Sequence, residues 1–366
     1  MNTNRNFIIW LLFLAATTLL GLYAAVQIFS QGHILFNAND VIMWTLPLGV
    51  YVFLALAGSG IALIASIPQI FGLERYKLLT KRLVFMAVAT LVGSFVAIGL
   101  ELGSIFHAVY FIASPNPSSP IWWMAVIYTI ELVALVVKFI RIQVNDWNSG
   151  VSKLVGIVSF FAAIFGPLVL GSVFGFTEAR PLYFGTFMPI FSLTIALVLG
   201  CALITIYNVI YHKTTGDTTF EEKKNLFNEI GIIFAFVAGL ALLFYLLRVG
   251  LKTAVTVPDF GTGKHFELVL GLAMPCVIMT VKSWRESIAG KVIASIIALA
   301  SIMGATMEIL ISGQSRPTGP KAEGLPEFLS YFPSIWEWMV LILAVGVVLA
   351  LYTLGEKYFQ LSLKPE

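Results

Sequence analysis

The sequence predicts an all-α integral membrane protein with ten transmembrane helices. Of its 366 residues 59% are hydrophobic and only 11% are charged, whereas soluble domains carry about 25% charged residues. The apolar residues also gather in ten runs of roughly 20 residues, the length needed to cross the hydrocarbon core. The runs cover residues 7–29, 41–66, 83–112, 121–139, 154–174, 185–210, 227–247, 266–281, 292–311 and 335–354.

Basic residues predict the orientation of these helices. If the amino terminus is cytoplasmic, six of the 22 Lys and Arg residues fall outside and the other 16 fall in cytoplasmic segments. This bias satisfies the positive-inside rule and predicts a multi-pass protein of the cytoplasmic membrane with both termini inside. The first run is longer than the apolar part of a signal peptide and has no small-x-small cleavage site, so we expect a signal anchor. The six outside residues are Arg180, Arg248, Lys252, Lys264, Arg316 and Lys321.

A weak internal repeat predicts how the helices are grouped. Aligning Pro47 on Pro189 also places Gly58 on Gly200, so the second and sixth runs share an early proline and a later small residue. Small residues let membrane helices approach closely. The repeat predicts two parallel four-helix bundles, helices 2–5 and helices 6–9, flanked by helices 1 and 10. The bundles would span residues 39–175 and 183–312 within one domain of residues 1–366.

Two carboxylates stand inside apolar runs, Glu101 in the third run and Glu131 in the fourth. An ionisable group at membrane depth costs several kcal/mol and by default marks a functional site. Glu101 lies about 11 residues from the end of its run, hence roughly 17 Å deep at 1.5 Å per residue. Glu131 lies about 10 residues into its own run, which predicts nearly the same depth. We expect both to be catalytic proton acceptors, and a structural hydrogen bond between helices is the alternative.

Further polar and aromatic residues gather near the predicted outer ends of these helices. A quinol that is oxidised sheds two protons, so its site needs an apolar slot, partners for the oxygens and nearby bases. A histidine can serve an oxygen of this kind near neutral pH. The alternatives are ordinary interfacial residues, belt tryptophans, and a helix cap formed by Asn39 and Asp40. The candidate binding residues are Asp40, His107, Asn116, Ser119, Trp123 and Tyr128.

Missing motifs limit the chemistry that the chain can perform alone. Among His33, His107, His212 and His265 only His107 is expected near the membrane interior, so two helices cannot supply a pair of haem ligands. The two cysteines are too few for an iron–sulfur cluster, which needs about four thiolates. No nucleotide-binding fingerprint occurs. We expect no metal, haem or iron–sulfur cluster in this chain and no nucleic-acid partner.

Three segments of the chain have distinctive patterns. The first runs from Trp44 to Gly60, with Trp-Thr-Leu-Pro at its start and Gly-Ser-Gly at its end; the second is Leu100-Glu101-Leu102-Gly103; the third is Asn116-Pro117-Ser118-Ser119-Pro120 followed by Trp123. Together they resemble the NrfD, or polysulfide-reductase, family of membrane subunits. The chain departs from the family at Ser104-Ile105, where Arg-Pro often stands. A contact to lipid, quinone or partner can therefore differ at this point.

This resemblance implies a function and partners. The segment from Tyr331 to Glu337 is similar to the ten-helix members, the membrane subunits of hydrogenase-2-type and Dsr-type complexes. Such a subunit passes electrons between the quinone pool, with menaquinone favoured over ubiquinone, and a periplasmic four-cluster ferredoxin-like iron–sulfur subunit. A further catalytic subunit would be a molybdoenzyme, a hydrogenase or a multihaem cytochrome. We expect docking on the outer loops at residues 175–184, 248–265 and 312–334.

A proton-coupled secondary transporter is the alternative function, because parallel repeats and carboxylates near the midplane are typical of transporters. The small number of polar residues in the second bundle makes a transporter the less favoured function. Proton translocation is a related open question. Glu131, Glu308, Lys138 and Arg141 would then be stations on a path from the cytoplasm, unless the two cations extend to the membrane surface instead.

Overall fold

A computed structural model describes residues 5–176, 183–215, 223–253, 266–312, 314, 315, 317 and 323–361. The regular structure of these residues is entirely helical, and nine of their helices are long and apolar enough to cross a membrane. The all-α membrane class is therefore confirmed. A tenth apolar helix, α11 (Phe266–Thr280), has only 15 residues, fewer than the roughly 20 needed to span the hydrocarbon core. The count of ten spans therefore stays a prediction.

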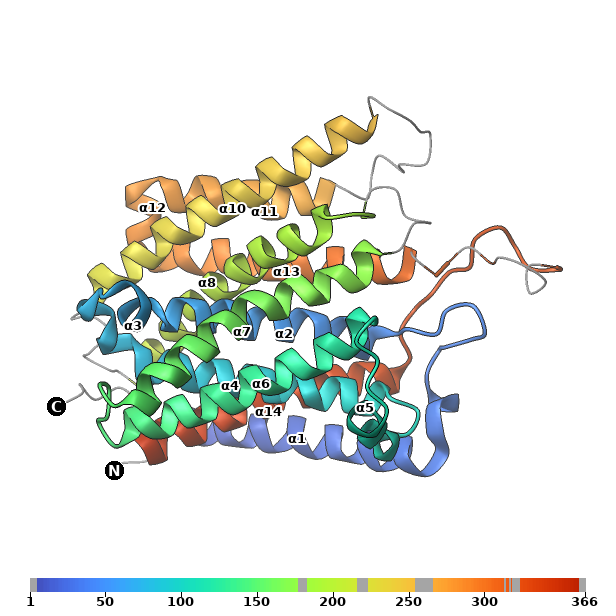
Figure 1. The fold of residues 1–366 in the computed structure, drawn as a ribbon, viewed down its shortest axis with the longest axis horizontal. Helices are drawn as coiled ribbons and strands as arrows, with labels where there is room; N and C mark the ends of the chain where they lie inside the picture. The colour runs from blue at the N-terminus through green and yellow to red at the C-terminus, as the bar shows by residue number, and fades with distance from the viewer. Residues whose placement is uncertain are drawn as a thin grey trace.

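The long helices lie side by side along one direction (Figure 1). Helix α1 begins, and helix α14 ends, at the end of the molecule where α3 and α12 also lie; we call this the terminal end. The opposite end carries α5 and is called the α5 end. The long helices are α1 (Arg5–Gln31), α2 (Leu46–Ala65), α4 (Lys77–Glu101), α6 (Pro120–Gln143), α7 (Gly150–Gly175), α8 (Phe187–Thr215), α10 (Lys224–Thr253), α13 (Ile288–Ser312) and α14 (Ile335–Phe359). The short helices are η1 (Gly32–Leu35), α3 (Ile67–Phe71), η2 (Glu74–Tyr76), η3 (Ile105–Val109), α5 (Tyr110–Ala113) and α12 (Lys282–Glu286).

Helix α2 is the centre of the packing. It contacts α4, α6, α7, α8, α13 and α14, and almost all of its residues are buried. Helices α8, α10, α11 and α13 form a second group of neighbours, while α1 packs on α14 and α14 packs on α4. Because extensive contacts between α2 and α8 and between α7 and α8 join the two groups, the division into separate bundles stays a prediction.

The third predicted span is wrong in its extent. Helix α4 ends at Glu101 rather than near residue 112, and Leu102 adopts an extended backbone. Gly103 and Ser104 follow, and glycine readily lets the chain leave a helix. The apolar residues after them form η3 and α5, which lie across the α5 end, and Phe106 there is 84% exposed. Glu101 is thus the last residue of its helix, not a residue about 17 Å deep.

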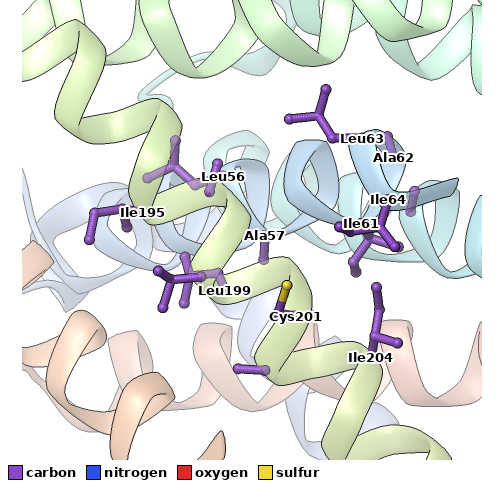
Figure 2. Close-up of a cluster of buried hydrophobic side chains, with 14 of the residues drawn as sticks. Leu56, Ala57, Ile61, Ala62, Leu63, Ile64, Ile195, Leu199, Cys201 and Ile204 are labelled. Carbon is purple, nitrogen blue, oxygen red and sulfur yellow. The ribbon is translucent and has the colours of Figure 1, made fainter. Parts of the chain in front are cut away.

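Helices α2 and α8 cross with their backbones in contact (Figure 2). A Cβ atom at Gly60 would collide with the carbonyl oxygen of Ala196 and lie 3.1 Å from the amide of Gly200. A Cβ atom at Gly200 would lie 2.7 Å from the amide of Ile61. Around the crossing, Leu56 and Ile195 belong to a continuous buried apolar cluster. The two glycines therefore set the distance between α2 and α8 and hold α2 at the centre.

We predict that Gly60→Ala lowers the free energy of unfolding by about 1–3 kcal/mol, because an added methyl group at a closed contact forces the backbones apart. The thermal unfolding midpoint of the purified protein in detergent measures this effect. Gly150→Ala at the start of α7 is the matched control, since a Cβ atom there meets nothing within 4 Å. Equal midpoints for the two variants would contradict the close crossing.

Candidate functional site

Glu101 binds the start of helix α2. One carboxylate oxygen accepts a hydrogen bond from the Thr45 amide at 2.8 Å, and the other accepts from the Thr45 hydroxyl at 2.8 Å. Thr45 is fully buried and is the N-cap residue of α2. The first amides of a helix have no partner within the helix, and a negative group beside them interacts favourably with the helix dipole. Glu101 supplies this group from the end of a different helix.

The backbone amides just before Thr45, and the first amide of α2 after it, also donate to side chains from distant parts of the sequence. The side-chain oxygen of Gln314 accepts from the amides of Met43 and Trp44, both at 2.8 Å. The hydroxyl of Tyr331 accepts from the Leu46 amide at 2.8 Å. The next residue is proline, which has no amide hydrogen. Three separate segments therefore converge on the amides of residues 43–46.

Glu337, in the first turn of α14, is a second carboxylate at this place and is fully buried. Its oxygens accept from the Asn37 amide at 2.6 Å and from the Tyr331 hydroxyl. Burial and the Glu337 carboxyl raise the pKa of Tyr331 above its usual range, so this hydroxyl remains a donor. The Ser334 hydroxyl accepts from the Glu337 amide at 3.3 Å, which is half of a capping box. The other half is missing because the carboxylate binds Asn37 instead.

His33 also lies beside Glu101. A ring nitrogen of His33 is 3.1 Å from the carbonyl oxygen of Leu100, in the last turn of α4, and the ring packs against Phe36. The expectation that only His107 lies near the interior is wrong, because His107 is exposed in η3 and its ring contacts Tyr110. His265 lies outside the described residues. Sequence reasoning missed His33 because its neighbour comes from a helix end nearly 70 positions later.

Most of the other predicted binding residues belong to the exposed turn between α4 and α6. Asn116 accepts from the Ser118 amide at 3.3 Å, and the Trp123 indole donates to the Pro117 carbonyl at 2.8 Å. Ser119 precedes α6 without a side-chain capping bond. Asn116 and Ser119 therefore lie in the turn before α6, while His107 lies in η3 and Trp123 in the first turn of α6. Hydrogen bonds within the segment hold Asn116 and Trp123.

Asp40 is exposed, six positions before the first residue of α2. The alternative that Asn39 and Asp40 cap this helix is wrong, since its N-cap is Thr45. Asn39 instead forms a turn of its own and accepts from the amides of Val41 at 2.9 Å and Ile42 at 2.8 Å. The helix begins later than predicted because Glu101 and Tyr331 satisfy the amides at Thr45 and Leu46.

Glu131 is buried between α6, α2 and α7, away from the exposed turn. One of its oxygens accepts from the Ser59 hydroxyl at 2.8 Å, and the other has no hydrogen-bond partner among the described residues. The hydroxyl of Tyr128, one turn earlier in α6, is also buried without a described partner. Gly166 leaves room for both side chains, because a Cβ atom there would lie 3.1 Å from the Glu131 carboxylate. A buried acid with an unused oxygen can take up or release a proton.

The two predicted carboxylates lie at different levels of the membrane helices. Thr45, which binds Glu101, and Ser59, which binds Glu131, are 14 positions apart on α2, or about 21 Å along its axis. The prediction of matching depth is wrong, because Glu101 lies at the end of its helix. The carboxylates therefore form two sites on α2.

Lys138 continues the polar surface between α2 and α6 toward the terminal end. It is 3% exposed, and its ammonium group donates to the hydroxyls of Ser66 at 3.0 Å and Ser159 at 3.5 Å. Ser59 and Ser66 on α2 face Glu131 and Lys138 on α6 with the same spacing of seven residues. Lys138 therefore points into the bundle instead of extending to the membrane surface.

An apolar cavity of about 40 Å³ lies between α2, α7, α8, α11 and α13. None of the predicted site residues lines it; its walls include Leu56, Leu170 and Ile302. Binding sites for ligands of drug size have volumes of about 300–1,000 Å³, so this cavity is too small for an aromatic ring system in the present conformation. Among the described residues, no group of three or more His, Cys, Asp or Glu side chains is arranged to hold a metal ion.

We predict that Tyr331→Phe lowers the free energy of unfolding by about 1–3 kcal/mol, because the Leu46 amide and a buried Glu337 oxygen lose their shared partner. Thermal unfolding in detergent measures the change. Tyr110→Phe removes the same hydroxyl from an exposed side chain and serves as the control. If the two variants unfold at the same temperature, Tyr331 does not hold the start of α2.

Two comparisons with known proteins are informative. The family described as polysulphide reductase, NrfD, matches residues 34–318 of the chain. A protein of Archaeoglobus fulgidus described as an Hdr-like menaquinol oxidoreductase integral membrane subunit is 24% identical over 372 residues. That alignment covers 95% of this chain and 92% of the relative. The matched family region includes α2, Glu101 and Glu131 but ends before Tyr331 and Glu337.

Proposed function

Because this chain belongs to the NrfD polysulphide reductase family, we propose that it is the quinone-reactive membrane subunit of a respiratory oxidoreductase complex. The substrate is menaquinol or menaquinone, as the description of the Archaeoglobus fulgidus relative suggests. Electrons pass between the quinone and a periplasmic iron–sulfur subunit that binds the α5 end. The catalytic subunit is a further protein of the complex. The family and the relative favour this function over the secondary transporter.

The position of Glu101 carries this proposal. Its carboxylate binds Thr45 at the start of α2. Trp44, next to Thr45 in the sequence, and Leu102, next to Glu101, have exposed apolar side chains. A quinone ring requires such an apolar surface together with a polar partner for its oxygen. Each carboxylate oxygen has two acceptor positions and uses one for Thr45, so each can still accept a quinol hydroxyl. His33 stands beside the same helix end as a second polar partner.

The reaction at this site is the oxidation of a quinol to a quinone, which releases two electrons and two protons. Glu101 accepts one proton from a quinol hydroxyl, and the Thr45 amide and hydroxyl hold the carboxylate in position. The proton of the other quinol hydroxyl leaves to the aqueous side at the α5 end. The two electrons leave to the iron–sulfur subunit. In the reverse direction Glu101 donates the proton to the reduced quinone.

The α5 end offers a surface for the iron–sulfur subunit. Ile34 in η1, Phe106 in η3, and Phe328 and Phe332 in the segment before α14 have strongly exposed side chains. These segments follow or precede the helix ends that lie at the α5 end. Exposed apolar patches of this kind mark interaction sites. The loops expected to dock the partner lie partly outside the described residues, namely residues 177–182, 254–265, 313, 316 and 318–322, and with them Arg180, Lys264, Arg316 and Lys321.

Glu131 and Lys138 support a second part of the proposal, a proton path between α2, α6 and α7. The path runs from Glu131 and Ser59 to Lys138 and Ser66, about 10 Å further along the helices. Toward the terminal end, Arg141 lies 3.4 Å from the Ser152 hydroxyl and is paired with Asp146. Buried ionisable groups in membrane helices are typical of proton relays. This path would couple quinone chemistry to proton movement from the terminal end.

We predict that Glu101→Gln lowers kcat for quinol oxidation by the intact complex about 100-fold, because an amide cannot take the proton. The variant keeps the shape of the side chain, and quinone content extracted from the complex should stay within twofold of the wild type. Glu74→Gln, which changes a carboxylate at the surface of η2, is the control. Wild-type turnover in Glu101→Gln would show that Glu101 is not the proton acceptor.

We predict that Lys138→Met uncouples proton movement from electron transfer. Methionine fills the same buried space without a charge, so quinol oxidation should fall less than threefold while proton uptake from the terminal end falls at least tenfold. A pH-sensitive dye inside proteoliposomes that hold the complex measures the uptake. Lys153→Met changes an exposed lysine at the same end and should leave the uptake unchanged. Unchanged uptake in Lys138→Met would remove Lys138 from the path.

A further inference from the structure

A groove lies on the outer surface between α10 and α11, far from the proposed quinone site. Its volume is about 480 Å³, within the range of about 300–1,000 Å³ seen for small-molecule sites. One wall is a single stripe of α10 that includes Ile232, Phe236 and Leu243, and the opposite wall includes Cys276 and Thr280 of α11. The three α10 side chains are largely exposed. The groove is therefore apolar along its length and open to the surroundings of the bundle.

Two features of the sequence create this groove. Helix α11 has 15 residues and α10 has 30, so α11 covers only about 22 Å of a helix that is about 45 Å long. The glycines of α10 have no side chains that would fill the space beside α11 and α12. A Cβ atom at Gly239 would lie 3.1 Å from the Cys276 sulfur, and one at Gly231 would lie 2.8 Å from Arg285 Cγ. A short helix beside a long, glycine-containing one leaves a channel between them.

The terminal end of the groove is positively charged. Arg285 of α12 lines it and donates from one guanidinium nitrogen to the carbonyls of Met279 at 2.9 Å and Thr280 at 3.1 Å. Its Nε atom is buried without a hydrogen-bond partner among the described residues. Lys282 and Trp284 are exposed in the same turn, and one carboxylate, Glu286, follows, so the turn has a net positive charge. An arginine whose side chain lines the groove at this position is suited to bind an anion.

We propose that this groove binds one anionic glycerophospholipid of the surrounding bilayer. Its acyl chain lies along the apolar stripe of α10, and its phosphate binds Arg285, with Lys282 close by. Basic pockets between membrane helices at the cytoplasmic surface bind anionic lipid headgroups, and tryptophan is typical of the same level of the membrane. The basic turn lies at the terminal end, which the charge bias predicts to be cytoplasmic. A partner helix is a poorer occupant, because its apolar surface would leave the positive charges of Arg285 and Lys282 without an anion.

Native mass spectrometry of the purified full-length chain, titrated with phosphatidylglycerol or phosphatidylcholine of identical acyl chains, tests this site. We expect one phosphatidylglycerol to bind at least fivefold more tightly than phosphatidylcholine. Arg285→Gln should lower the affinity for phosphatidylglycerol about fivefold, the effect of about 1 kcal/mol for one basic residue. Arg285→Lys should retain most of the preference, and Lys153→Gln, at an exposed position of α7, should not change it.

A second variant separates lipid binding from the structural role of Arg285. Gly239→Leu fills the groove without touching the charge and should weaken binding of both lipids while their ratio stays unchanged. Equal affinity of the wild type for the two lipids would overturn the proposal. Two other results would also overturn it, because each would assign the groove to a different occupant. One is displacement of phosphatidylglycerol by added menaquinone, and the other is cross-linking of Cys276 to another subunit in the intact complex.

Discussion

The amide groups at the start of helix α2 cannot be left to bulk water, because Thr45 and Leu46 are buried among other helices. Burying a backbone donor without a partner costs about as much as losing a hydrogen bond. The chain meets this requirement with Glu101 from the end of α4 and Tyr331 from the segment before α14. Gln314, from the segment after α13, binds the amides of the two residues just before them. The packing of the helices at the α5 end therefore depends on a few side chains that bind the start of α2.

In the proposed function, this constraint accounts for chemistry at two places. At the helix start, the group that satisfies the backbone is itself a carboxylate, so the residue that we propose as proton acceptor is also one that holds the start of α2. Deeper in the bundle, Ser59 of α2 and Ser66 at its C-cap bind the ionisable groups Glu131 and Lys138 of α6. In the proposed function, the quinone reacts at the first place and protons move through the second. The close crossing at Gly60 and Gly200 holds α2 in the position that both places require.

The sequence predicted the class of fold well, because apolar runs of membrane length are a strong signal. It also identified Glu131 as buried, since α6 continues as one helix on both sides of it. It placed Glu101 too deep because residues 105–112 are as apolar as the helix before them, and only Gly103 and Ser104 indicated the break. Composition alone does not distinguish an apolar surface helix from the end of a transmembrane one.

The partners of the two carboxylates were beyond sequence reasoning. Thr45 and Ser59 look like ordinary small polar residues, and they become part of a site only through packing against α4 and α6. His33 and Glu337 gain their roles in the same way, from contacts between distant segments. The pattern from Ser334 to Glu337 did give a signal, since it has the spacing of a capping box. This spacing is typical of a helix start, which the structure has at Ile335, but it does not indicate that the carboxylate binds Asn37.

The most direct test of the account is to locate the quinone on the chain. The intact complex would be labelled with a photoreactive azidonaphthoquinone, with excess menaquinol as competitor, and the modified peptides identified by mass spectrometry. The account predicts competitor-sensitive labels within residues 33–46 or 100–104, around His33, Thr45 and Glu101. Labels confined to α8, α10, α11 or α13, with these two segments unmodified, would contradict it.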